Sequence, residues 1–353
     1  FACADATTSG GTEVVNATGL TIGETYLVRV YGYGTNSGTG TFTICVTTPA
    51  VPSYFRTKQS GEWTDANTWE VSTDNMTWSN AVNSPTVTDL DIAVMHDVTI
   101  SSGTVTTDQL VIESGATIDI TGGTLSISDG TGDDLSVFGV IKNAGTLAGL
   151  GSRIIKNVGI YQHNFTTLTS IPTFSWDAGS TCEIIGYASA SGTQGGVNQS
   201  FHHFIWNCPN QSGNTNFTGA MTSLSGNLEV NNTGSGSIRL TGGTQTTLNI
   251  SGNFIVTGGT LDLSSGTSNT IIELTGNFEM SGGTLTESST GSGTIEFNGI
   301  DQSFIKSAGT ISNTINFIVN SGSSVDFSTY ILDGSNGTFT LTSGATLKTA
   351  NAT

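Results

Sequence analysis

A short phrase that recurs three times between Ser225 and Gly299 sets the period of this chain. It reads SGNLEV, SGNFIV and TGNFEM, and its asparagines are Asn227, Asn253 and Asn277. The phrase therefore returns after roughly 25 residues, and a period of this length indicates a repeat architecture in which each unit packs against its two neighbours. The chain is expected to fold as a solenoid.

Within one repeat the apolar residues come in pairs with a single residue between them. Such a pair predicts a very short strand with one inward face, and the Gly, Ser, Thr and Asn residues between pairs turn the chain. Three strands and three corners make one coil of a parallel β-helix, whose coils stack about 4.8 Å apart. A helical solenoid is excluded, because no window has helical apolar spacing and Gly and Thr are poor helix formers. The pairs of one repeat are Leu228 with Val230, Ile238 with Leu240, and Leu248 with Ile250.

The regular pattern starts at Val98 and predicts an all-β fold, a right-handed parallel β-helix of about ten coils over residues 98–353. Residues 131–224 are less regular and richer in aromatic residues, so inserted loops are expected there. The sequence ends on LKTANAT, which gives no polar finish to the last coil. We therefore expect the solenoid to continue past Thr353.

Residues 1–50 show a different pattern. TYLVRVYGY and TFTICV alternate apolar and polar residues and are joined by a Gly, Ser and Asn turn, which predicts a β-hairpin. The segment resembles the closing strands of small β-sandwich modules of bacterial secreted proteins, but it is too short for a complete sandwich. We interpret residues 1–50 as the C-terminal part of such a module.

Residues 51–97 are interpreted as a junction and as the N-terminal cap of the β-helix. The end of a solenoid exposes its core and its strand edges, so it needs a cover. Trp63, Trp69 and Trp78 lie close together in this segment and are predicted to plug that end. The alternative is a platform of exposed aromatic rings that stacks on sugars.

The recurring asparagine predicts a structural ladder. Asn227, Asn253 and Asn277 each follow a glycine at the same place in the repeat. We expect their side chains to point inward at a corner and to hydrogen-bond to the amides above and below, as stacked amides do in cross-β assemblies.

The four cysteines allow three pairings. Cys182 and Cys208 are one repeat period apart and would face each other on neighbouring coils at a distance that suits a disulfide. Cys3 and Cys45 flank the β segment of residues 1–50 and would close it. Two disulfides imply an oxidising, extracytoplasmic setting, and the alternative is four buried free thiols.

The charge composition narrows the range of partners. Nine basic residues against 27 acidic ones give a net charge of −18, which argues against binding nucleic acid or an anionic membrane through charge. The sequence also contains no apolar run of the roughly 18 residues that a membrane-spanning helix needs. We expect neither a nucleic-acid partner nor a membrane span.

No cofactor is predicted. Asp89, Asp91 and Asp97 offer the oxygen ligands that suit Ca²⁺, but their spacing matches no calcium-binding loop of the EF-hand type, and turn capping is the simpler interpretation. His202 and His203 are adjacent, so on a strand their rings would point to opposite faces and would not converge on one metal ion.

A catalytic site in a β-helix would need charged residues that converge across coils. The one basic cluster, Lys142, Arg153 and Lys156, has no carboxylates at coil spacing and is interpreted as a set of surface cations. Carboxylate pairs for glycoside hydrolysis must lie about 5–10 Å apart. Three pairs would approach each other across coils, but each is expected on outward positions, so no catalytic residue is predicted. These pairs are Asp119 with Glu113, Asp262 with Glu287, and Glu273 with Glu296.

The middle of the chain resembles a known group of proteins. IPTFSWDAGSTCEIIG at 171–186 and NQSFHHFIWNCPNQSGN at 198–214 are similar to a segment of the large surface proteins that gliding and related bacteria export through the type IX secretion system. GEWTDANTW, GSGSIRL, GSGTIEF and GTFTLTSGATLKT resemble the same group, so the resemblance covers residues 53–353. It implies a secreted, surface-attached multidomain protein of the adhesin-like kind.

These features lead to one functional expectation. We expect a non-catalytic structural or adhesive segment of an extracellular protein on the bacterial outer surface, a rigid acidic rod that spaces or displays other modules. Its partners would be a surface polysaccharide or another cell-surface protein, together with the type IX secretion machinery that the resemblance implies. The alternative is a carbohydrate-binding or polysaccharide-degrading β-helix. A third interpretation is self-association into a fibre through open coil ends.

Overall fold

The computed structural model describes residues 14, 15, 17, 20, 24–29 and 52–350, without 244, 289 and 335. The chain divides into two units, Phe1–Pro49 and Ala50–Thr353. The predicted β-sandwich module falls in the first unit and lies largely outside the described residues. Residues 24–29, where the predicted hairpin begins, form no strand.

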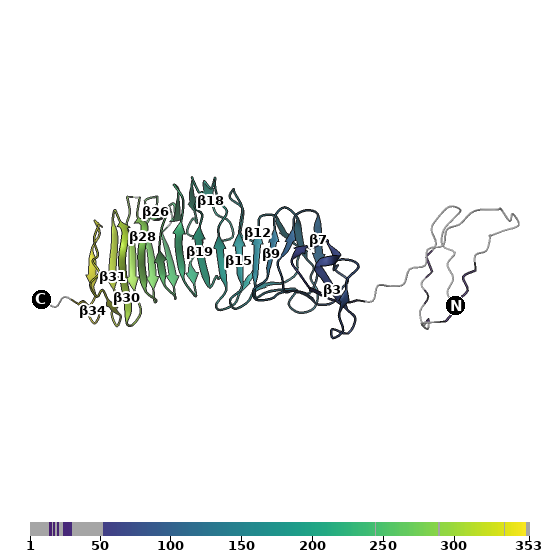
Figure 1. Ribbon diagram of the computed structural model, residues 1–353. Helices are drawn as coiled ribbons and strands as arrows, with labels where there is room; N and C mark the ends of the chain where they lie inside the picture. Colours follow the sequence, from purple (N-terminus) through teal and green to yellow (C-terminus); the bar gives the residue numbers. More distant parts are fainter. Residues whose placement is uncertain are drawn as a thin grey trace. The chain divides into compact units, whose positions relative to one another are not determined.

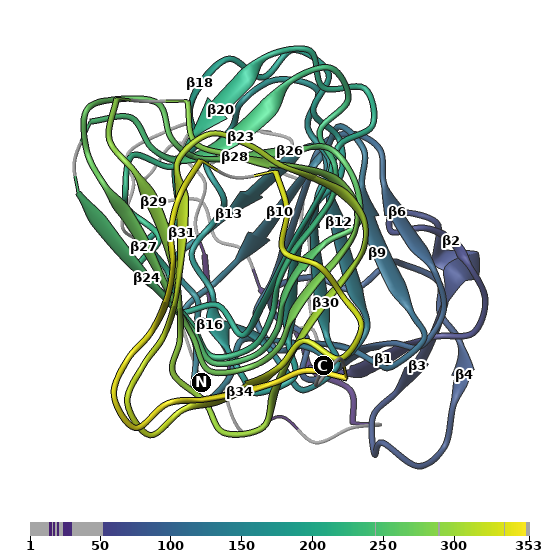
Figure 2. The same ribbon diagram turned by 90° about the vertical axis from the view of Figure 1, so that its left-hand side faces the viewer.

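The second unit is a parallel β-helix of about eleven turns, which confirms the predicted fold class. Figure 1 shows its strands lying side by side in a row, and Figure 2 shows the coils superposed when viewed end-on. A complete coil contributes a first, a second and a third strand, in chain order. Within the described residues, no helix is long and apolar enough to cross a membrane.

The second strands form one ladder along the whole solenoid. Each pairs in parallel with the next, from Gly61 opposite Val98 to Ser324 opposite Thr346. The ladder runs through β2 (Gly61–Glu62), β6 (Val98–Ile100), β9 (Thr117–Ile120), β12 (Val140–Asn143), β15 (Ile160–His163), β17 (Thr181–Ile184), β19 (His203–Asn207), β22 (Leu228–Asn232), β25 (Phe254–Val256), β28 (Phe278–Thr286), β30 (Gln302–Ile311), β32 (Ser324–Asp326) and β34 (Thr346–Lys348).

The first and third strands form shorter sheets beside this ladder. The first strands are β5 (Ile92–Val94), β8 (Leu110–Ile112), β11 (Leu135–Val137), β14 (Arg153–Ile155) and β16 (Ser175–Trp176), then β21 (Ser223–Leu224), β24 (Thr246–Ile250), β27 (Thr270–Leu274), β29 (Gly293–Phe297), β31 (Ile315–Val319) and β33 (Phe339–Leu341). The third strands are β7 (Thr104–Thr107), β10 (Thr124–Ile127) and β13 (Thr146–Ala148), then β18 (Gly192–Thr193), β20 (Asn214–Asn216), β23 (Ser237–Thr241) and β26 (Thr260–Ser264). β28 and β30 are long enough to serve as both second and third strands.

The regular half of the solenoid has the register that the repeat predicts. Leu228 lies opposite Phe254, and Phe254 opposite Phe278, so residues one repeat apart stack along the axis. Phe278 and Phe304 are parallel with ring centroids 5.0 Å apart. These fully buried rings fill the core, and their stacking in one column explains why the apolar residue after each asparagine recurs.

Coils in the less regular half are shorter and have a different core. Tyr161 lies opposite Cys182, and Cys182 opposite Phe204, so residues stack here at shorter intervals than in the regular half. Polar side chains occupy inward positions, among them Asn143 and His163, which are 1% and 0% exposed. The sheets of first and third strands are both interrupted in this half, where loops leave the coil.

The solenoid begins earlier than the sequence pattern predicts. β1 (Tyr54–Thr57) already pairs in parallel with β5, and β2 with β6, so the first coil lies inside the expected junction. An antiparallel edge covers this end, because β3 (Trp69–Ser72) pairs with β1 and β4 (Ser79–Asn80) pairs with β3. A short 3-10 helix, η1 (Ala66–Thr68), precedes β3.

Candidate functional site

The N-terminal end is closed by two of the three predicted cap residues. Trp63 and Trp69 are 1% and 0% exposed, and their rings meet edge to face at 4.9 Å. The Trp69 indole nitrogen donates to the Trp63 carbonyl oxygen at 2.8 Å. Trp78 is only half-buried and lies under the Arg56 guanidinium, which is 4.2 Å from the ring centroid. The three rings therefore form no shared flat platform for a sugar.

The asparagines form a ladder of a different kind from the one predicted. The Asn227 side-chain oxygen accepts the backbone N–H of Asn253 at 2.8 Å, and the Asn253 oxygen accepts that of Asn277 at 2.9 Å. Asn277 continues the ladder to the N–H of Ser303 at 2.8 Å. The side chains are half-buried at the entry to the second strands, so the expected inward amide-to-amide contacts are wrong. The ladder pins each corner to the next coil.

The predicted disulfide between Cys182 and Cys208 is wrong. Both cysteines are buried and free. The coils here are shorter than the repeat period, so Phe204 and not Cys208 lies opposite Cys182. Cys208 instead donates its thiol to the Ile184 carbonyl oxygen at 3.5 Å, and burial raises the pKa of Cys208 to about 12. Cys3 and Cys45 lie outside the described residues.

The two adjacent histidines come together, contrary to the prediction. The rings of His202 and His203 are 4.3 Å apart, because His202 lies in the bend before β19 and strand alternation does not apply to it. The His202 Nδ1 is 2.9 Å from the Ser225 hydroxyl, and the His203 Nδ1 accepts the N–H of Asn227 at 3.0 Å. Burial lowers the pKa of His203, and this histidine, not the pair, starts the asparagine ladder.

The three aspartates considered for Ca²⁺ do not converge. Asp89 accepts the N–H and the hydroxyl of Thr86 at 2.8 and 2.9 Å, which caps a turn. Asp97 accepts the N–H of Thr117 from the next coil at 3.1 Å. Among the residues that the structure describes, no three His, Cys, Asp or Glu side chains are grouped so as to hold a metal ion.

The basic cluster is paired at coil spacing, which the sequence interpretation missed. Lys142 contacts Asp119 at 2.9 Å and Lys156 contacts Asp133 at 2.8 Å. Arg153 donates to the Gly149 carbonyl oxygen at 2.6 Å. Lys142 lies directly opposite Asp119 in register, so the expectation that no carboxylate recurs near these cations is wrong.

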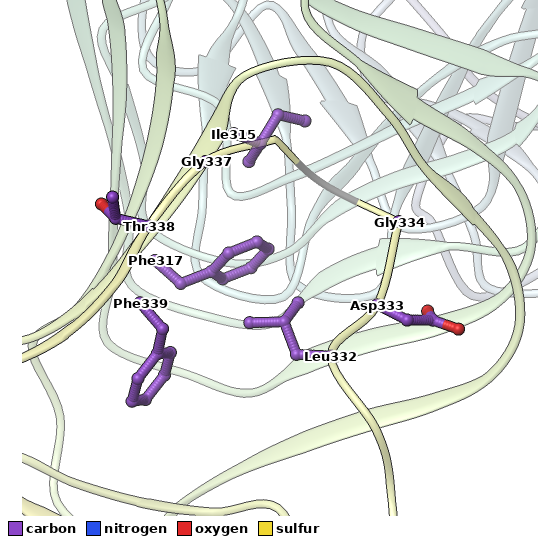
Figure 3. Close-up of a pocket in the computed structure, with 8 residues that line it drawn as sticks. All are labelled: Ile315, Phe317, Leu332, Asp333, Gly334, Gly337, Thr338 and Phe339. Carbon is purple, nitrogen blue, oxygen red and sulfur yellow. The ribbon is translucent and has the colours of Figure 1, made fainter.

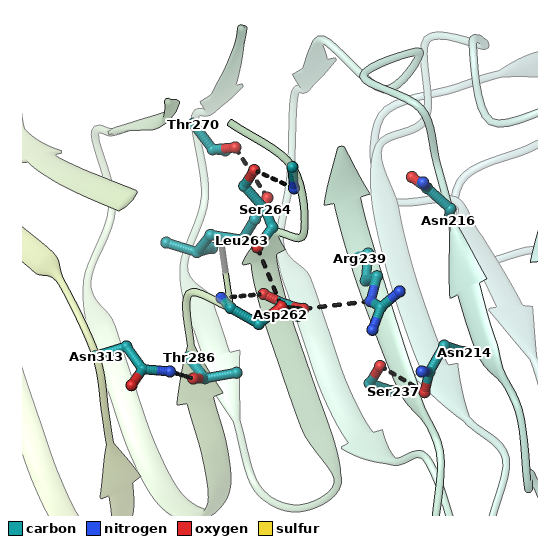
Figure 4. Close-up of polar contacts among 12 residues, drawn as sticks. Asn214, Asn216, Ser237, Arg239, Asp262, Leu263, Ser264, Thr270, Thr286 and Asn313 are labelled. Atoms are coloured by element: carbon teal, nitrogen blue, oxygen red, sulfur yellow. Dashed lines mark hydrogen bonds and ion pairs between the residues drawn. The ribbon is translucent and has the colours of Figure 1, made fainter. Parts of the chain in front are cut away.

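One of the carboxylate pairs is buried and not exposed as expected. Asp262 and Glu287 are 2% and 1% exposed. Figure 4 shows Asp262 of β26 beside Arg239 of β23, with a nitrogen-to-oxygen distance of 3.2 Å. Ser288 donates to Asp262 through its N–H at 3.0 Å and through its hydroxyl. Burial raises the pKa of Asp262, although the contacts with Ser288 and Arg239 act in the opposite direction. The contacts with Ser288 also hold the loop after β28 against the neighbouring coil.

The other two pairs lie on outward positions, as expected. Glu273 and Glu296 are directly opposite each other on β27 and β29 and are half-buried. Asn320 donates to Glu296 at 2.7 Å. Asp119 is engaged by Lys142 instead of approaching Glu113.

A buried polar network, which no sequence motif predicts, lies in the core of the less regular half. Asn143 donates to the Tyr161 hydroxyl at 3.2 Å, and that hydroxyl lies 3.0 Å from the His163 Nδ1. The His163 Nε2 is 3.0 Å from the Thr169 carbonyl oxygen, which also accepts from Tyr187 at 3.0 Å. Burial lowers the pKa of His163 to about 4, against the hydrogen bond to Thr169. The network therefore organises the core of this half.

The C-terminal end carries a shallow hollow. Figure 3 shows its lining, with Phe317, Leu332 and Phe339 at the centre and Asp333 at the rim. The Asp333 carboxylate is engaged by Lys306 at 2.7 Å. The hollow therefore has apolar side chains at its centre and an ion-paired carboxylate at its rim.

Comparison with family models, with curated proteins and with solved structures finds no match.

Proposed function

We propose that this chain is a rigid, non-catalytic rod of a secreted bacterial surface protein, which spaces or displays other modules. The observation that carries the proposal is the ladder of second strands, in which each strand from β2 to β34 pairs with the next without a break. A solenoid of this kind holds its two ends at a fixed separation, because each coil is fixed by its two neighbours.

Side chains reinforce the ladder in a way that suits a spacer. The Phe278 and Phe304 rings stack inside the coils, and Asn253 and Asn277 cross-link the corners. An outer surface with a net charge of −18 for the chain favours solubility and repels like surfaces. These features together favour a stiff, hydrated shaft.

The extracellular setting rests on the sequence resemblance alone. The IPTFSWDAGSTCEIIG and NQSFHHFIWNCPNQSGN segments are similar to surface proteins exported by the type IX system. Under this proposal the chain reaches the outer surface through that machinery, and its partners there are a polysaccharide or another surface protein.

Stiffness is tested with two spin labels on one outward column. Thr99→Cys and Ile255→Cys are seven coils apart in the ladder, which predicts a separation of about 34 Å. Cys3→Ser and Cys45→Ser leave only the buried pair Cys182 and Cys208 as native thiols, which escape labelling. Pulsed electron spin resonance should give a narrow distance distribution. A broad or much shorter distribution would contradict a rigid rod.

The non-catalytic part of the proposal has its own test. Incubation of the full chain with acidic and neutral polysaccharides, followed by viscosity and reducing-end assays, should show no depolymerisation. Product formation that survives repurification of the chain would replace the spacer with an enzyme.

A further inference from the structure

One outward column runs along the second strands for ten consecutive coils. Every neighbouring pair in it is in direct register. Its members are Thr99, Asp119, Lys142, Gln162, Glu183, Ile205, Glu229, Ile255, Glu279 and Ile305. The last six alternate strictly between glutamate and isoleucine, and we call them the Glu-Ile column.

The two halves of this column differ in charge balance. In the first half Asp119 is neutralised by Lys142. In the Glu-Ile column, none of the ion pairs found among the described residues involves Glu183, Glu229 or Glu279. The isoleucines keep these carboxylates two coils apart, or about 9.6 Å, which is close to the distance over which salt screens charge.

Hydrogen-bond donors flank the column on one side. On three successive coils Asn227, Asn253 and Asn277 precede the column by two residues, and their side-chain oxygens are held by the backbone of the next coil. This leaves the amide nitrogens as donors beside the column, and that of Asn253 reaches Glu279 at 3.0 Å. Over the coils of these three asparagines the surface therefore offers acidic groups, an apolar group and amide donors.

The distance between successive glutamates, two strand spacings or about 9.6 Å, selects the conformation of a partner chain. A polyproline-II helix has three residues per turn and rises about 9.3 Å per turn, so its mismatch is about 0.3 Å per repeat. An α-helix places residues on one face every seven positions, or about 10.5 Å, and an extended strand every two positions, or about 6.7 Å. The polyproline-II helix also exposes unpaired backbone carbonyls, which the asparagine amides would meet.

We propose that the Glu-Ile column binds a basic polyproline-II segment, with a Lys or Arg at every third residue, laid along the solenoid axis. The cations lie over Glu183, Glu229 and Glu279, and the intervening residues pack on the isoleucines. This surface goes beyond the spacer role, because it makes the side of the rod an adhesive site.

The test uses two labelled twelve-residue peptides of equal composition. One repeats Lys-Pro-Pro four times, and the other carries the same four lysines at irregular intervals among the prolines. At low ionic strength the full chain should bind the regular peptide about fivefold or more tightly than the irregular one, and the preference should shrink as salt is added. Fluorescence anisotropy reads the dissociation constants.

Two surface variants decide whether the column is responsible. Glu229→Gln with Glu279→Gln should weaken binding of the regular peptide about tenfold, because two ion pairs are removed. Glu273→Gln with Glu296→Gln removes the same charge from the first-strand sheet and should leave the preference unchanged. Equal affinity for both peptides, undetectable binding, or equal losses in both variants would overturn the proposal. The spin-label distance reports separately on the rod.

Discussion

Two halves of one solenoid solve the same packing problem with different side chains. Between β22 and β30 one inward column is aromatic, and Phe254, Phe278 and Phe304 follow one another along the axis. Between β12 and β20 the same inward column contains Tyr161, and the adjacent inward column contains His163. The contrast teaches that the backbone ladder tolerates either core, provided that each buried polar group finds a partner.

Buried glutamines show what the less regular half requires. Where a loop leaves the coil, backbone groups lose their ladder partners. Gln194 donates to the carbonyl oxygens of Thr169 and Gly195, and Gln211 accepts from the Trp206 indole at 2.8 Å. Such glutamines supply backbone hydrogen-bonding partners that the ladder no longer supplies at these loops.

The largest effect is expected from the apolar core. Phe278→Ala removes a fully buried ring that contacts Phe254, Phe304 and Phe317. We expect a loss of about 3–5 kcal/mol in the free energy of unfolding, measured by denaturant titration. A loss below about 1 kcal/mol would show that the coils collapse around the cavity and that the stack is not what fills this half.

The polar core should respond to pH with a defined sign. His163 has a pKa of about 4 in the folded chain, below its ordinary value, because it is buried. Between about pH 6.5 and pH 4 the unfolded chain binds the extra proton, so stability present above this window is lost as the pH falls, by roughly 3 kcal/mol. Hydrogen exchange of β15 and β17 measures this loss.

The regular half provides the control for that experiment. It contains no histidine between residues 225 and 327, and burial raises the pKa of its Asp262. A raised carboxyl pKa adds stability as the pH falls, which is the opposite sign. Equal acid loss of protection in β15 and β25 would contradict the assignment to His163.

The asparagine ladder should contribute less than either core. Asn253→Ala removes the acceptor of the Asn277 N–H and the donor to Glu279. We expect a loss of about 1–2 kcal/mol, because a half-buried N–H is left without its partner. Asn249→Ala on the exposed side of β24 is the matched change and should cost less than about 0.5 kcal/mol by the same denaturant titration.

The smallest effect concerns a corner in the less regular half. Val158 has a φ of 63°, at the position two residues before β15 where two other coils have Gly115 and Gly179. A β-branched residue is strained there, so Val158→Gly should raise the melting temperature, with a gain of about 1 kcal/mol. A Cβ added at Gly115, which has a φ of 88°, meets no atom within 4 Å, so Gly115→Val should lose a similar amount through backbone strain. If neither variant changes the melting temperature, the backbone at this corner is not strained by a β-branched residue.

The sequence predicted the regular half well, because its landmarks repeat at a nearly constant interval. The pairings of Leu261 with Leu285 and of Ile250 with Leu274 follow from counting residues. In a parallel solenoid, counting residues is equivalent to assigning register, as long as no coil changes length.

The same counting failed where the coils are shorter. The repeat period of the regular half suggested that Cys182 faces Cys208, but the actual coil is shorter and puts Phe204 there. The burial of Asp262 was also missed, because it depends on a loop from the next coil that folds over the strand. The local alternation of apolar and polar residues predicts which face of a strand a residue is on. Whether a segment from another coil then covers that face depends on the tertiary structure.

The direction of the ladder has a mechanical consequence. Its hydrogen bonds run along the axis of the shaft, so a pull on the two ends passes through every coil in series, and the terminal coils, which have one neighbour each, peel away first. Each coil that peels away frees about 24 residues, or up to roughly 80 Å of slack. A rod built in this way would keep its length under a weak pull and lengthen in steps of one coil under a strong one.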